Sequence, residues 1–179
     1  MKTKTLLTSI AASFMLSSFA IAGPVDYNNS TPSSSALFGP ETNVGLYAMY
    51  VKPDGDGADK KWGGGLVGEH FFSSYFGVAG SAAWVDMGET GTWHNYIGDA
   101  VIRIPIESLR IAPYALAGAG MIYGDDDWNL VGRFGAGIDV RITRGFGIFG
   151  DWIYHIPEGS TGLSGEDYAI TRIGVKISF

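Results

Sequence analysis

Residues 128–141 have the sequence WNLVGRFGAGIDVR, in which polar and apolar side chains alternate. The charged residues of this stretch all fall on odd positions, and its even positions include Leu130, Phe134, Ala136, Ile138 and Val140. Because successive side chains of a β-strand point to opposite faces, the stretch predicts a strand with one polar and one apolar face. It is also longer than the about 5–6 residues of an average strand in a soluble protein.

Turn-forming residues divide the chain from residue 42 onward into eight stretches of similar character. The expected strands are residues 42–51, 62–72, 75–86, 93–105, 110–122, 128–141, 146–155 and 168–179. Alternation is also clear in the fourth and eighth, where Asp99 with Arg103, and Arg172 with Lys176, share one face. The first and fifth are apolar on both faces, so the sequence does not orient them. Most of these stretches reach the about 9–11 residues that a membrane-spanning strand needs.

The alternation has two explanations. In a soluble β-sandwich the apolar face turns inward, whereas in an outer-membrane barrel it meets lipid and the interior is polar. The lengths of the connections distinguish them, because short and longer links alternate along the chain. The short links lie near residues 73–74, 106–109 and 143–145, and the longer ones at 52–61, 87–92, 123–127 and 156–167. Short turns at one end and long loops at the other favour the outer-membrane barrel.

Aromatic side chains gather at both ends of the expected strands. Beside the longer loops lie Trp62, Trp84, Trp93, Trp128 and Trp152, and beside the short turns lie Phe72, Phe76, Phe146 and Phe179. All the tryptophans except Trp93 share the parity of the apolar face. Two such belts indicate two membrane interfaces, where amphipathic rings are favoured.

The C-terminus ends in a polar residue, a glycine and alternating hydrophobic residues: Arg172-Ile-Gly174-Val-Lys-Ile177-Ser-Phe179. This ending resembles the assembly signal of bacterial outer-membrane barrels. Residues 42–179 as a whole resemble the small eight-stranded families, the OmpX/OmpA-type and opacity-type barrels. The resemblance implies an all-β, eight-stranded, antiparallel up-and-down transmembrane β-barrel. It also implies that Arg172, Gly174, Ile177 and Phe179 direct assembly, with the barrel assembly machinery and periplasmic chaperones as partners.

In such a barrel the polar face lines the lumen, which eight strands make just wide enough for side chains. The charges expected inside are Glu69, Asp99, Asp139 and Asp151, together with Arg103, Arg133, Arg141, Arg172 and Lys176. Because unpaired buried charges are costly, we predict a ladder of ion pairs that closes the lumen, and no open pore.

The first 22 residues are predicted to be an export signal. Lys2 and Lys4 precede an apolar stretch, and Ala20-Ile21-Ala22 forms a small-x-small cleavage site. Residues 23–41 are rich in Pro, Ser and Asn without periodicity, which predicts a flexible leader. The expected organisation is therefore a signal peptide (1–22), a leader (23–41) and a barrel (42–179) in the outer membrane of a diderm bacterium.

The composition excludes several other classes. With no Cys there is no disulfide scaffold, Cys-based zinc site or thiol nucleophile. A formal net charge of −6 without a basic cluster argues against nucleic-acid binding. The glycines follow strand periodicity and lack the ending of a phosphate loop, and His70 and His94 stand apart from other ligands. We therefore expect no cofactor.

Two loop sequences raise site hypotheses. Asp54, Asp56 and Asp59 are spaced as in calcium loops, but the distal Glu is missing and two lysines follow, so a solvated turn is expected. The run of acids at residues 125–127 is similar, with cation bridging to lipopolysaccharide phosphates left open. His155, Glu158 and Ser160 could form a hydrolase trio at the rim, although no further signature accompanies them.

The sequence thus favours a monomeric barrel, not an enzyme, with a structural or surface-interaction role and with outer-membrane lipid and lipopolysaccharide as partners. Two alternatives remain open. One is an outer-membrane acyl hydrolase acting on lipid A through the last long loop. The other is a soluble exported β-barrel that binds a small ligand.

Overall fold

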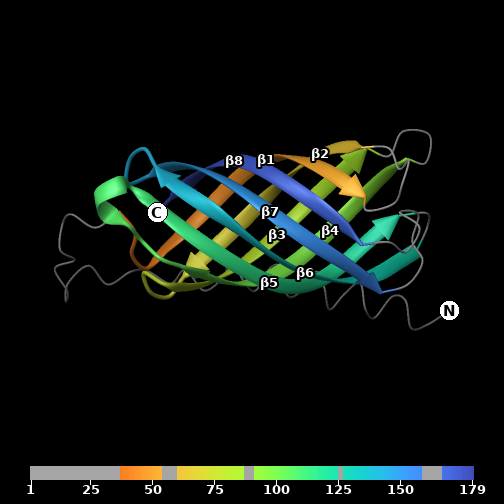
Figure 1. Ribbon diagram of the computed structural model, residues 1–179, viewed down its shortest axis with the longest axis horizontal. Coiled ribbons are helices and arrows are strands. Elements are labelled where there is room, and N and C mark those ends of the chain that lie inside the picture. The colour runs from red at the N-terminus through yellow and green to blue at the C-terminus, as the bar shows by residue number, and fades with distance from the viewer. Residues whose placement is uncertain (1–36, 54–59, 87–90, 125–126, 159–166) are drawn as a thin grey trace. The chain divides into compact units, whose positions relative to one another are not determined.

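The computed structural model describes residues 37–53, 60–86, 91–124, 127–158 and 167–179 (Figure 1). The strands are β1 (Glu41–Pro53), β2 (Lys61–Phe71), β3 (Phe76–Asp86), β4 (Thr92–Arg103), β5 (Ile111–Gly124), β6 (Asp127–Arg141), β7 (Phe146–Glu158) and β8 (Tyr168–Ser178). Each pairs antiparallel with its neighbours in sequence, and β8 pairs with β1, so the sheet closes. The predicted eight-stranded up-and-down barrel is confirmed.

The strands are staggered as they go round the barrel. Following the paired residues from Asn43 through every strand and back to β1 arrives at Pro53, ten residues further along. Closure with such a stagger tilts the strands by about 35–45° from the barrel axis. Figure 1 accordingly shows them running obliquely. The closed ladder gives backbone N–H and C=O groups partners on both sides of every strand.

The connections at one end are tight turns. The backbone N–H of Phe72 donates to the carbonyl of Phe76 at 2.9 Å, and that of Ile142 donates to Phe146 at 3.0 Å. Between β4 and β5 a 3-10 helix, η2 (Glu107–Leu109), makes the turn, and Arg110 behind it adopts a left-handed backbone with φ of 58°. The connections at the opposite end fall largely outside the described residues.

Buried and exposed side chains alternate along the strands, so the barrel has a clear inside and outside. The structure orients the two strands that the sequence left open. Tyr47 and Met49 of β1 point inward, as do Leu116 and Ile122 of β5. Among the described residues, no helix is long and apolar enough to cross a membrane.

The folded unit begins earlier than the predicted boundary at residue 42. Glu41 is the first residue of β1 and pairs with Phe71 of β2. Before it, Phe38 is buried and only 1% exposed. The end of the segment predicted to be a leader therefore packs against the barrel.

Candidate functional site: the charged lumen

The inside of the barrel carries a set of ion pairs. Five carboxylates and five cationic groups take part: Glu41, Glu69, Asp99, Asp139 and Asp151, with Arg103, Arg133, Arg141, Arg172 and Lys176. Nine of them are positions that the sequence assigns to the interior, and Glu41 is the addition. Each cation has a carboxylate partner, which offsets part of the cost of removing charge from water.

The pair of Asp99 and Arg133 joins β4 to β6 across the strand between them. Arg133 Nε donates to Asp99 Oδ1 at 2.8 Å, its Nη2 donates to Asp99 Oδ2, and the same Nη2 donates to Ser81 Oγ at 2.9 Å. Gly118 of β5 lies between the two partners in the register. A Cβ there would come within 2.4 Å of Asp99 Oδ1 and 2.0 Å of the Gly98 carbonyl, so only glycine leaves room for this bridge.

Asp151 of β7 is held by three donors. Arg172 of β8 binds it through two bonds, Nε to Oδ1 at 2.8 Å and Nη2 to Oδ2 at 2.7 Å. Tyr114 reaches from β5 and donates its hydroxyl to Oδ2 at 2.6 Å. Gly137 makes room for this contact, because a Cβ there would lie 2.7 Å from the Tyr114 ring. The bidentate geometry fixes both side chains.

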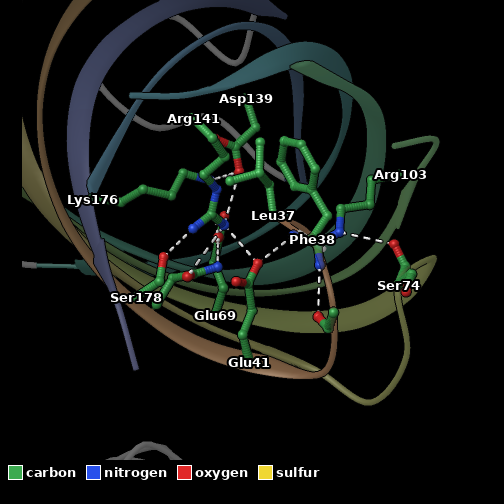
Figure 2. Close-up of polar contacts among 12 residues, drawn as sticks. Leu37, Phe38, Glu41, Glu69, Ser74, Arg103, Asp139, Arg141, Lys176 and Ser178 are labelled. Carbon is green, nitrogen blue, oxygen red and sulfur yellow. Dashed lines mark hydrogen bonds and ion pairs between the residues drawn. The ribbon is translucent and has the colours of Figure 1, made fainter. Parts of the chain in front are cut away.

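Lys176 of β8 lies between two carboxylates. Its Nζ is 3.0 Å from Glu69 Oε2 and 3.1 Å from Asp139 Oδ2. Asn43 also donates to Glu69 Oε2 at 3.0 Å. The ammonium therefore connects β2, β6 and β8 through the lumen, and Figure 2 shows all three charged side chains pointing inward.

At the short-turn end, two arginines converge on one carboxylate (Figure 2). Arg103 Nη1 of β4 and Arg141 Nη2 of β6 lie 2.6 and 2.5 Å from Glu41 Oε1. Arg103 also donates to the carbonyls of Gly39 and Ser74, at 2.8 and 3.0 Å. Both arginine side chains are almost completely buried.

Phe38 lies at the same end, ahead of β1 in the chain. Its ring centroid lies 5.3 Å from the Arg103 guanidinium carbon and 5.2 Å from that of Arg141, within cation–π range. The backbone N–H groups of Leu37 and Phe38 donate to the Glu107 carboxylate of η2, at 2.9 and 3.2 Å. Residues 37–41 are thus bound to β4, η2 and β6.

The half of the lumen beside the long loops is different. Its buried side chains form an apolar cluster that includes Met49, Val51, Val85, Trp93, Ile97, Ile122, Val131 and Ile170. Trp93, whose parity departs from the other tryptophans, is one of them and is 3% exposed. His155 is also buried here and stacks on Tyr168 with ring centroids 4.8 Å apart. Neither ring nitrogen of His155 has a side-chain partner among the described residues.

Except for Trp93, the residues of the two aromatic belts lie on the outer surface. Trp62, Trp84, Trp128 and Trp152 are exposed near the long-loop end, and Phe72, Phe76 and Phe146 near the short turns. Between the belts the outer face carries exposed aliphatic side chains such as Ile138 and Ile173. The outside of the barrel is therefore apolar where the inside is charged.

Solved structures identify this arrangement. No protein-family model matches the chain, and no curated protein matches it in sequence. Neisserial surface protein A matches with a TM-score of 0.66 and 12% identity over 77% of this chain and 97% of that chain. A de novo designed transmembrane β-barrel matches with a TM-score of 0.57 and 13% identity, covering 79% and 97%. Ail, the attachment invasion locus protein of Yersinia pestis, matches with a TM-score of 0.52 and 20% identity, covering 79% and 99%.

The chain has the fold of a small outer-membrane β-barrel. The identities are low, so the likeness concerns the fold and not a shared activity. That one of these barrels is a designed protein makes the same point, since the architecture exists without an evolved function.

The residues of the C-terminal assembly hypothesis occupy both faces of β8. Arg172 points inward to Asp151, whereas Ile177 and Phe179 are exposed. Phe179 exchanges two backbone hydrogen bonds with Thr42, at 3.0 and 3.2 Å. A Cβ at Gly174 would lie 2.6 Å from the Phe149 ring, so this glycine lets the ring pack against β8.

The structure describes two of the three residues of the hydrolase trio. His155 points into the lumen, whereas Glu158 of the same strand is exposed. Ser160 lies outside the described residues, as do Asp54, Asp56 and Asp59 of the calcium hypothesis. Within the described ranges, no group of three or more His, Cys, Asp or Glu side chains could hold a metal ion.

Sequence reasoning missed several interior partners. Glu41 lies in the segment predicted to be a leader, although it shares the odd parity of Asn43 and is reached by extending the first strand by one residue. Tyr114 was missed because its strand is apolar on both faces. Phe38 carries no sequence signal, since a single aromatic residue in a Pro- and Ser-rich segment has no periodicity.

Proposed function

We propose that this protein is an integral outer-membrane β-barrel whose charged interior closes the lumen, and that it serves membrane integrity or surface contact. The observation that carries the proposal is the inverted distribution of side chains. Asp99, Arg133 and Arg172 are at most 7% exposed, whereas Ile173 and Trp62 are 69% and 66% exposed. A closed barrel with this distribution is suited to hydrocarbon outside and not to water.

The belts support a membrane of ordinary thickness. Tryptophans near the long loops and phenylalanines near the short turns would lie at the two interfaces, with the aliphatic band between them in the acyl chains. Short turns face the periplasm in such barrels, and long loops face outward. The N-terminal stretch with its cleavage site supports export, since a periplasmic route is needed to reach the outer membrane.

The ion pairs support a closed lumen. Arg133, Arg172 and Lys176 extend from the wall into an interior that eight strands make only about one side chain deep. Residues 37–41 and the two arginines beside them add a layer at the short-turn end. Within the described strands, these side chains occupy space that a continuous polar channel would need, and this favours a structural or contact role over transport.

Contact with partners is expected through the longer connections of the sequence, since these face outward in such barrels. Ail is named as an attachment invasion locus protein, and it has also been solved with the heparin analogue sucrose octasulfate. Surface contact by this chain through its loops is the corresponding proposal. Outer-membrane lipid, lipopolysaccharide and the assembly machinery would be its partners, and the barrel would act as a monomer.

Heat modifiability tests the proposal. The full chain would be expressed in a diderm bacterium and extracted from outer membranes in mild detergent. We expect the unboiled sample to migrate faster than the boiled one, because a closed barrel stays folded in the gel. Liposomes carrying the protein should admit small sugars no faster than liposomes containing a heat-denatured sample. Recovery in the soluble fraction without detergent would favour the soluble ligand-binding barrel instead.

A second candidate, lipid A hydrolysis, can be tested in the same preparation. The variants Ser160→Ala and His155→Phe should release acyl chains at the same rate as the parent protein, which is the background rate. Release that depends on either residue would replace the structural role with an enzymatic one.

A further inference from the structure

The seam between β1 and β8 differs from the other strand junctions. Every other pair of neighbouring strands is consecutive in the chain and is tethered by its own connection. The two strands of the seam lie at opposite ends of the barrel sequence. Pairing them therefore closes a chain loop that contains all the other strands. When the hydrogen bonds of the seam break, no short connection keeps the edges together. The seam is therefore the junction at which the barrel can open most widely.

Arg141 binds both edges of this seam from a strand that belongs to neither edge. From β6, its Nη2 contacts Glu41 Oε1 on β1 at 2.5 Å. Its Nη1 donates to Ser178 Oγ on β8. One guanidinium thus holds the first residue of β1 and the last residue of β8, as Figure 2 shows.

Residues 37–41 hold this arginine in place. The Phe38 ring packs against the guanidiniums of Arg141 and Arg103, and Arg103 shares the Glu41 carboxylate. The backbone of the segment is fixed independently, through the Glu107 carboxylate of η2. An arginine in a fixed position loses less entropy when it binds, so its bonds to the seam are stronger than those of a mobile side chain.

We propose that Phe38, Glu41, Arg141 and Ser178 form a latch that controls opening of the β1–β8 seam. The latch sets the rate at which the folded barrel unfolds. To separate β1 from β8, the chain must break the Glu41–Arg141 or Arg141–Ser178 contact and expose a buried guanidinium. Breaking these contacts before the strands part raises the barrier to opening, which is how kinetic stability arises.

The test compares unfolding rates of full-length variants in detergent micelles, followed by tryptophan fluorescence after a jump into urea. Ser178→Ala removes one seam contact and leaves the Glu41 contact. Phe38→Ala removes the packing beside Arg141. We expect each to unfold about tenfold faster than the parent, the effect of losing one hydrogen bond or packing contact to a buried charge. If Phe38→Ala does not fold, Ser178→Ala is sufficient for the comparison.

Engineered disulfides can test where the latch acts, because the chain has no Cys of its own that could form competing pairs. Leu46→Cys with Val175→Cys crosses the seam between register partners that are both exposed on the outer face. Val78→Cys with Ala100→Cys is the matched control between β3 and β4. The seam disulfide should abolish the acceleration caused by Ser178→Ala or Phe38→Ala, and the control disulfide should leave it.

Two outcomes would overturn the latch. One is an unchanged unfolding rate in both variants. The other is an acceleration that persists when the seam is covalently closed, because the residues would then stabilise the barrel without guarding its seam. Neither outcome affects the proposed membrane function, since that rests on heat modifiability of the parent protein, which is measured separately.

Discussion

The two halves of the lumen are held together in different ways. Beside the short turns, charged groups connect strands that are not neighbours, as Lys176 of β8 does with Glu69 of β2 and Asp139 of β6. Beside the long loops, side chains such as Met49 and Ile122 fill the space by apolar packing. Directional bonds specify which residues must meet, whereas packing accepts many combinations of similar volume. The charged half therefore fixes the register of the barrel, and the apolar half fills it.

The largest loss of stability is expected when one charge of a buried ion pair is removed. In Asp151→Asn the buried Arg172 loses its carboxylate, so we expect the free energy of unfolding to fall by about 3–5 kcal/mol. Equilibrium urea titration in lipid vesicles, followed by tryptophan fluorescence, measures the loss. The paired variant Asp151→Leu with Arg172→Met removes both charges and should recover most of it. A small effect in the single variant would mean that water reaches this pair.

The next prediction tests the assignment of inside and outside on which the comparison rests. Ile138 is exposed on the outer face, beside the inward-pointing Asp139. Ile138→Arg would place a charge in the acyl chains. It should destabilise the folded barrel in vesicles, with a fall of about 2–4 kcal/mol in the free energy of unfolding.

The control for this variant is Ile142→Arg, which lies just beyond β6 at the short-turn end. Because the cost of an exposed arginine falls to about 0–1 kcal/mol near the interface, this variant should fold almost normally. Equal costs at the two positions would contradict the inference that Ile138 lies deeper in the membrane than Ile142.

A smaller loss is expected when a neutral hydrogen-bond partner is removed from a buried ion pair. Ser81→Ala deletes one acceptor of Arg133 and leaves both bonds to Asp99. We expect a destabilisation of about 1.5–3 kcal/mol, as for a hydrogen bond to a charged group. The same urea titration measures it, and a cost as large as that of Asp151→Asn would show that Ser81 positions the whole pair.

The smallest effect is expected in the apolar half. His155→Phe keeps a ring to stack on Tyr168 and removes two nitrogens that have no side-chain partner among the described residues. Stability should change by less than about 1 kcal/mol, in either direction. A loss above about 2 kcal/mol would show that His155 has a bonding partner in the loops or in bound water, and that this half also depends on polar contacts.

The difference between the halves also explains what the sequence could predict. Strands whose inner face is charged, such as β6, show alternation, so their inner and outer faces could be assigned from the sequence, as for residues 128–141. In β1 and β5 the inner positions contribute to the apolar filling, through Met49 and Ile122 for example. An apolar inner face opposite an apolar outer face leaves no alternation, and orientation then depends on the neighbouring strands.

Contacts between distant parts of the chain were beyond sequence reasoning for another reason. The charges expected inside lie there, but which acid meets which base depends on the stagger of the closed sheet. Arg133 could have paired with several carboxylates, and only the register places it against Asp99 across Gly118. Phe38 depends on the same geometry, because the position of its binding site is set by Arg103 and Arg141 on two other strands.

The equal numbers of acids and bases in the lumen have a consequence for the rest of the molecule. The five carboxylates and five cations cancel, so the formal charge of −6 on the chain is carried by residues outside this network. The buried pairs lie beyond the reach of counterions, whereas charges on the rims are screened over a Debye length of about 8 Å at physiological ionic strength. Ionic strength should therefore alter what the barrel attracts or repels, while its interior remains indifferent to salt.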